Sequence, residues 1–187
     1  MNDSRQVSWG ASNMDAHDRI YRLARLSLLL ALATVIHTAE GFLPVTFAWF
    51  RFGFANVIGL ATLCLFGFKD AFFVTLGRIF LGSLIGGLFG SPAFLLSLSG
   101  GTSAIIVMGL AHRWCSRMFS EIGISVLGAV VHNSAQLVVA YLAIVRNEGI
   151  ILLLPVMIIT AVGTGFLNGL AARLFLSHFK SVDDIHG

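Results

Sequence analysis

The sequence predicts an all-α, polytopic integral membrane protein of one domain, built from about six transmembrane helices. Apolar residues make up 57% of its 187 residues, and charged residues make up 11%. An ordinary soluble domain has about 25% charged residues. The long apolar segments also lack the alternation of apolar and charged faces that helices of soluble proteins show. We therefore expect most of the chain to contact membrane lipid.

Residues 1–18 are polar and are expected to form a flexible cytoplasmic N-terminal tail. Residues 19–178 form the expected membrane domain, and residues 179–187 a cytoplasmic C-terminal tail. The first apolar segment has no small-residue cleavage site, so we expect it to remain as the first helix. The six expected helices cover about residues 20–38, 52–68, 71–90, 92–111, 122–145 and 150–176. Pro44 and the aromatic residues after it suit a non-helical cap at the outer interface.

The placement of charge predicts the orientation. With the N-terminus inside, nine basic residues fall on the inner side and two on the outer side, as the positive-inside rule requires. The inner ones are Arg5, Arg19, Arg22, Arg25, Lys69, Arg113, Arg117, Arg173 and Lys180, and the outer ones are Arg51 and Arg146. Both termini are then cytoplasmic, in the cell inner (cytoplasmic) membrane. The same placement argues against nucleic acid as a partner, despite a formal charge of +3.

The third expected helix carries Arg78, Gly82, Gly86 and Gly90, each four residues apart. At this spacing the glycines share one face and form a groove that permits a close helix crossing. Two interpretations of Arg78 remain open: snorkelling to the inner interface or structural pairing, and a role in substrate binding or coupling. In the first helix, Ser27 and Ala31 form a small-xxx-small pair suited to packing within the chain or against a partner subunit.

Polar residues recur at one estimated depth of the fourth, fifth and sixth helices. They are Ser97, Ser99, Gly100, Gly101 and Thr102, then His132, Asn133 and Gln136, then Thr160, Thr164 and Asn168. Such groups must face protein or water rather than lipid. Hydrogen bonding between helices is the simpler interpretation, at about 0.6 kcal/mol per contact. The clustering favours the other interpretation, a substrate-binding cavity built by the third to sixth helices.

Glu40, Arg51 and Asn56 are expected at the outer mouth of this cavity, where solvated loop charges are the alternative. Arg51 could draw an anionic ligand inward. His37 and His132 have no carboxylate or cysteine company in the sequence pattern, so no metal site is expected. We also expect no catalytic residues and no cofactor, because no acidic residue falls within the expected spans and no phosphate-binding glycine loop occurs.

Five motifs occur in order along the chain: residues 40–44 (EGFLP), residues 51–56 (RFGFAN), Arg78, residues 97–101 (SLSGG) and residues 132–136 (HNSAQ). With these motifs the chain resembles the Gx transporter family, also called heptaprenyl diphosphate synthase component I. Through it, the chain is similar to substrate-binding (S) components of energy-coupling-factor transporters. The resemblance covers about residues 20–176. One departure is Arg-Phe-Gly-Phe at residues 51–54, where the family usually has Lys-Leu-Gly-Leu.

This resemblance implies a bundle that captures a small molecule from the outer side and moves it by alternating access. A membrane coupling subunit and ATPase subunits on separate chains would supply the energy, and Ser27 and Ala31 are a candidate docking surface by analogy. A second hypothesis is a membrane accessory subunit of a heptaprenyl or polyprenyl diphosphate synthase, or of an isoprenoid or quinone pathway, with a soluble prenyltransferase as partner. Because diphosphate–metal chemistry needs clustered carboxylates, such a subunit would have no catalytic activity of its own. A third hypothesis is a structural subunit of a membrane redox complex.

Overall fold

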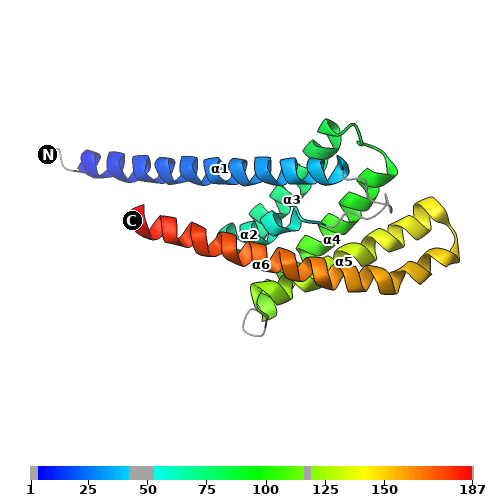
Figure 1. Ribbon diagram of the computed structural model, residues 1–187. Helices are drawn as coiled ribbons and strands as arrows, with labels where there is room; N and C mark the ends of the chain where they lie inside the picture. The colour runs from blue at the N-terminus through cyan, green and yellow to red at the C-terminus, as the bar shows by residue number, and fades with distance from the viewer. Residues whose placement is uncertain (1–3, 43–52, 116–118, 187) are drawn as a thin grey trace.

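The computed structural model describes the backbone of residues 4–42, 53–115 and 119–186, and the side chains of residues 17–41, 53–114 and 119–179. Over these ranges the chain is helical without strands, which confirms the expected all-α class (Figure 1). The elements are α1 (Ser4–Phe42), α2 (Asn56–Phe66), α3 (Phe68–Ile85), α4 (Pro92–Cys115), α5 (Glu121–Val139), a π-helical turn η1 (Ala140–Val145), a 3₁₀ helix η2 (Glu148–Leu153) and α6 (Leu154–His186).

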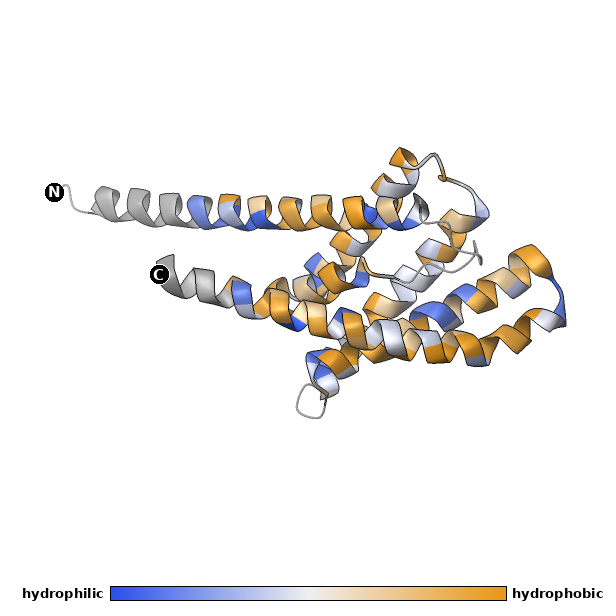
Figure 2. Cartoon of the chain, viewed as in Figure 1, coloured by the Kyte–Doolittle hydropathy of each residue, from blue (hydrophilic) through white to orange (hydrophobic). Residues whose placement is uncertain are grey.

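Four helical segments are long and apolar enough to cross a membrane, which supports a multi-pass membrane protein. They are His17–Gly41, Pro92–Trp114, Glu121–Val145 and Glu148–Phe179. Large apolar side chains are exposed along them, such as Leu152 at 81% and Ile159 at 72%, and Figure 2 shows apolar residues along much of their length. The 11 residues of α2 extend only about 16 Å, against an apolar bilayer core of about 30 Å.

The two helices α2 and α3 form an antiparallel hairpin around Gly67. Gly67 has a φ of 92°, a conformation that residues with a side chain rarely adopt. Residues at equal distances on either side of it face each other: Asn56 bonds to Arg78, and Thr75 lies against Gly59. The turn was expected later, at Lys69 and Asp70. Those two residues instead lie in the first turn of α3, where Asp70 forms an ion pair with Arg22 of α1 at 2.5 Å.

Helix α3 ends at Ile85 in a Schellman motif, five residues before the expected end. Gly87 has a φ of 66°, its N–H donates to the Leu84 carbonyl at 3.2 Å, and the Leu88 N–H donates to the Ser83 carbonyl at 2.8 Å. The glycine groove predicted along residues 78–90 is therefore wrong beyond Gly82. Gly86 caps the helix, and Gly90 lies outside it with no neighbour within 4 Å of a Cβ placed there.

Helix α1 crosses α3 closely through two glycines. A Cβ at Gly77 would lie 2.8 Å from Leu30 Cδ1, and a Cβ at Gly82 would lie 2.6 Å from His37 Cδ2. Both distances are below those of real Cβ contacts, so a side chain at either glycine would force Leu30 or His37 to move. Ser27 and Ala31 of α1 are exposed instead, and their role as a docking surface for a partner remains a prediction.

On the other side of the bundle, α4, α5 and α6 pack side by side, again through glycines. A Cβ at Gly165 would lie 2.7 Å from Val126 Cα, and one at Gly169 would lie 2.6 Å from Ile122 Cα. The N-terminal end of α1 and the C-terminal end of α6 lie at the same end of the molecule (Figure 1).

Candidate functional site

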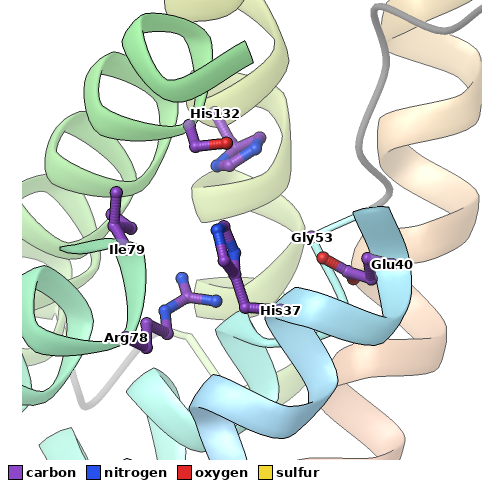
Figure 3. Close-up of a pocket in the computed structure, with 7 residues that line it drawn as sticks. His37, Glu40, Gly53, Arg78, Ile79 and His132 are labelled. Carbon is purple, nitrogen blue, oxygen red and sulfur yellow. The ribbon is translucent and has the colours of Figure 1, made fainter. Parts of the chain in front are cut away.

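Polar side chains from four helices, together with Gly53 from the turn before α2, surround a cavity between α1, α3, α4 and α5. Its described lining residues are His37, Glu40, Gly53, Arg78, Ile79, Ser97 and His132. The side chains of His37, Arg78 and His132 point toward one another, and Glu40 extends from α1 toward Gly53 (Figure 3). The empty space is about 230 Å³, including what is open to the outside. Its centre has room for about one water molecule.

Arg78 lies deep in the bundle and is hydrogen-bonded there. It is 2% exposed, and its Nη2 donates to Asn56 Oδ1 at 2.5 Å. Both residues lie 11 positions from the hairpin turn at Gly67, which corresponds to about 16 Å along each helix. The snorkelling interpretation is therefore wrong, because the guanidinium is held inside the bundle. The bond to Asn56 is the structural pairing that the sequence left open, and Asn56, expected at the outer mouth, does not itself line the cavity.

The acidic residue of the cavity comes from α1. This helix continues to Phe42, whereas the sequence pattern ends it at residue 38. Glu40 thereby lies within the apolar span His17–Gly41 at 7% exposure, so the expectation that the spans hold no acidic residue is wrong. A Glu40 carboxylate oxygen accepts a hydrogen bond from the backbone N–H of Phe54. His37, one turn earlier on the same face, is 4% exposed and also lines the cavity.

The α4 and α5 helices contribute Ser97 and His132. Helix α4 runs unbroken from Pro92 to Cys115, so the glycine pair at positions 100 and 101 leaves its backbone helical. Ser97 is 3% exposed, and its hydroxyl has no hydrogen-bond partner among the described residues. His132 Nε2 and Gln136 Nε2 form a hydrogen bond of 3.0 Å one turn apart on α5.

Three glycines make room for these polar groups. A Cβ at Gly82 would meet His37. At Gly100 it would lie 2.9 Å from both His132 Cε1 and Gln136 Cγ, and at Gly53 it would lie 2.9 Å from Asn56 Nδ2. Gly53 also has a φ of 70°. At each of these three positions, the backbone lies so close to a polar side chain that only a residue without a Cβ fits without a shift.

Other predicted site residues lie elsewhere. The Ser99 hydroxyl donates to the Leu96 carbonyl of its own helix at 3.1 Å, and Gly101 faces Ile79. The buried Thr102 hydroxyl has no partner in the described part of the chain, and Thr102 does not line the cavity. Asn133 Nδ2 donates to the Met157 carbonyl of α6 at 3.1 Å, so the structure places Asn133 at the α5–α6 contact. Arg51 lies outside the described residues.

Helix α6 supports the cavity without lining it. Asn168, 2% exposed, donates from Nδ2 to the Gly53 carbonyl at 3.1 Å. Thr160 and Thr164 bond to carbonyls of their own helix. We expected the third to sixth helices to build the cavity. This expectation is correct for α3, α4 and α5 and wrong for α6, whose place is taken by α1. Sequence reasoning missed His37, Gly53 and Ile79 as lining residues, although the spacing of His37 and Glu40 on one helix face was a usable signal.

Within the described ranges, no group of three His, Cys, Asp or Glu residues could hold a metal ion. The described part of the site is a buried set of hydrogen-bonding and charged groups. Such groups can form hydrogen bonds with a polar ligand.

These features define a multi-pass helical membrane protein with a polar cavity inside its bundle. The sequence profile of heptaprenyl diphosphate synthase component I matches residues 29–175, and the chain belongs to this family. The match includes every described residue that lines the cavity. No curated protein and no solved structure matches the chain.

Proposed function

We propose that this protein is the substrate-binding subunit of a membrane transporter, resembling an S component. It captures a small polar molecule from the outer side in the cavity around Arg78 and moves it by alternating access. The observation that carries the proposal is the convergence of buried Arg78, Glu40 and His132 from three helices on one cavity. Ionisable side chains inside a membrane are costly, and they mark ligand or ion pathways.

Packing alone explains this convergence less well. An interhelical polar contact in a membrane contributes about 0.6 kcal/mol on average, which is small beside the cost of removing an arginine and a glutamate from water. Asn133 shows what a packing contact looks like here, a single amide bonded to a backbone carbonyl of the next helix. The cavity instead combines a cation, a carboxylate, two imidazoles and a hydroxyl.

The proposal includes six membrane crossings, with both termini on the cytoplasmic side of the cell inner membrane. Four of these crossings are the long apolar helices, and the proposal assigns the other two to the α2–α3 hairpin, of which α2 itself, about 16 Å long, covers only part of the bilayer core. The excess of arginine and lysine on the side of the termini supports this orientation. Labelling of single cysteines introduced at Ser91 and at Ser177 tests it: an impermeant reagent outside intact cells should modify the first and spare the second.

Energy for transport comes from partner chains. The sequence has no phosphate-binding glycine loop, so ATP hydrolysis belongs to separate ATPase subunits acting through a membrane coupling subunit. The exposed Ser27 and Ala31 on α1 offer that subunit a surface of small residues.

The family description favours one second candidate, a membrane accessory subunit of heptaprenyl diphosphate synthase. In that role the apolar helices would hold a prenyl chain, and Arg78 would lie near its diphosphate. Glu40 is the only carboxylate among the described lining residues. The magnesium-dependent chemistry would therefore belong to a soluble prenyltransferase.

Purification from native membranes in mild detergent, followed by mass spectrometry of the co-purifying chains, separates the two candidates. The transporter proposal predicts a second membrane protein together with ATPase chains. Capture of a soluble prenyltransferase without ATPases contradicts it and supports the accessory role. A protein with Ala31→Leu, which enlarges one exposed small residue, should lose the coupling subunit and keep its own fold.

A further inference from the structure

The cavity contains one positive and one negative formal charge among its described lining residues, apart from the two histidines. Arg78 is 2% exposed and Glu40 is 7% exposed. Moving an unbalanced charge out of water is costly, whereas two opposite charges in one site compensate each other. The arginine and the carboxylate therefore balance each other before any ligand arrives.

One short turn provides a hydrogen-bonding partner to each of these charges. The Asn56 side-chain oxygen accepts from Arg78 Nη2 at 2.5 Å, and the Phe54 backbone N–H donates to the Glu40 carboxylate. Residues 53–56 thus present a neutral acceptor to the cation and a neutral donor to the anion. The turn occupies the position where a ligand with the same polarity would bind.

The geometry points to a small zwitterion, carrying a carboxylate and an ammonium group, as the ligand of this cavity. The inference rests on the proposed function and names its substrate class. Arg78 binds the carboxylate through the planar guanidinium, and Glu40 binds the ammonium group. Both new contacts join two ionised groups of opposite sign, which adds a charge–charge attraction that the neutral groups of the turn do not supply.

Charge balance favours a zwitterion over a simple carboxylate, a simple amine or a neutral amide as the ligand. A zwitterion leaves the net charge of the cavity unchanged. A simple carboxylate adds one uncompensated negative charge, and a simple amine adds one positive charge, in surroundings where either is costly. A neutral amide keeps the balance but forms weaker hydrogen bonds with both Arg78 and Glu40.

The rest of the lining fits a short polar ligand. The buried Ser97 hydroxyl has no partner among the described residues and lies at the cavity, where it can bond a ligand group. Ile79 is the only large apolar side chain of the described lining, so little of the ligand is apolar. Because the centre has room for about one water molecule, the ligand enters by displacing the contacts of the turn.

A homologous series tests the charge class. The full-length protein in lipid nanodiscs is titrated with ω-amino acids from glycine to 6-aminohexanoate, and with the matching carboxylates and amines, while thermal unfolding reports binding. At least one zwitterion should bind saturably, about tenfold or more tightly than both of its singly charged counterparts. Equal binding of the matching carboxylate or amine overturns the inference, and so does a lack of binding across the whole series.

Two charge-removing variants provide the second test. The measured preference is the ratio of the affinity for a zwitterion to that for its singly charged counterpart. In Glu40→Gln this ratio should move toward the carboxylate series by about tenfold or more, and in Arg78→Gln toward the amine series by about the same factor. Because each preference is a ratio measured on one variant, a general loss of stability does not change it. Glu148→Gln, at an exposed residue of η2, is the matched control and should keep the preference of the native protein. An unchanged preference in both site variants overturns the inference.

The two proposals fail in different ways. A singly charged or uncharged molecule found bound to the purified protein overturns the zwitterion inference and leaves the transporter proposal intact. Absence of any bound small molecule, together with the lack of saturable binding, overturns both.

Discussion

Replacing Gly100 with alanine tests whether the close approach of α4 and α5 holds the polar site together. The added Cβ would lie 2.9 Å from both Gln136 Cγ and His132 Cε1. Both neighbours are 5% exposed or less and belong to one hydrogen-bonded pair, so the added Cβ must displace this pair. Overpacking of this kind costs about 1–3 kcal/mol.

Alanine also favours a helix over glycine by about 1 kcal/mol, which would mask part of this cost. Gly163→Ala provides the matched control, because Gly163 lies inside α6 and has no neighbour within 4 Å of the added atom. Both variants gain the same helix propensity. The difference between their unfolding free energies therefore isolates the steric term, and we expect Gly100→Ala to be less stable than Gly163→Ala by about 1–3 kcal/mol.

The assay is denaturant unfolding of the two purified variants in identical mixed micelles, followed by the loss of helix circular dichroism. If Gly100→Ala were as stable as Gly163→Ala, the α4–α5 approach would be looser than the structure shows. The explanation of the glycine as space for His132 would then be wrong.

Three further predictions use the same assay. Gly67→Ala should lose about 1–3 kcal/mol through backbone strain alone, because the φ of 92° disfavours a side chain although nothing lies within 4 Å; a stability equal to the native protein would contradict the hairpin turn. Asn168→Ala should lose about 1–3 kcal/mol with the bond to the Gly53 carbonyl, whereas Thr164→Ala, whose hydroxyl bonds only its own helix, should lose less. Arg22→Gln should cost at most about 1 kcal/mol, and less at high salt, because the Arg22 side chain is 58% exposed.

The helical class and most helix positions follow from the sequence, because apolar composition and length determine where a helix can enter a membrane. Helix ends are less predictable. Apolar helices tolerate glycine, so the pattern did not mark Gly86 and Gly87 as a stop. The Schellman motif depends on backbone hydrogen bonds that no hydropathy pattern contains.

The candidate site was predictable in part. Depth in the membrane identified Ser97 and His132 correctly as residues facing the protein interior, since each is 5% exposed or less. It did not settle Arg78, for which snorkelling to the inner interface remained open. It could not distinguish Asn133, which faces α6, from its neighbour His132, because adjacent helical residues differ by 100° in direction. Glu40 was expected at the outer mouth because the polar residues after position 38 were interpreted as the end of the helix.

The measurement that tests the central claim most directly is the small-molecule content of the protein purified from native membranes, determined by native mass spectrometry. We compare the native chain with Arg78→Gln, which removes the charge inside the cavity, and with Asn133→Ala, which removes only a contact between α5 and α6. The account predicts a bound molecule near one per chain in the native protein and in Asn133→Ala, and its loss in Arg78→Gln. Equal occupancy in Arg78→Gln, or no bound molecule in the native protein, would contradict the claim that this cavity is a ligand site.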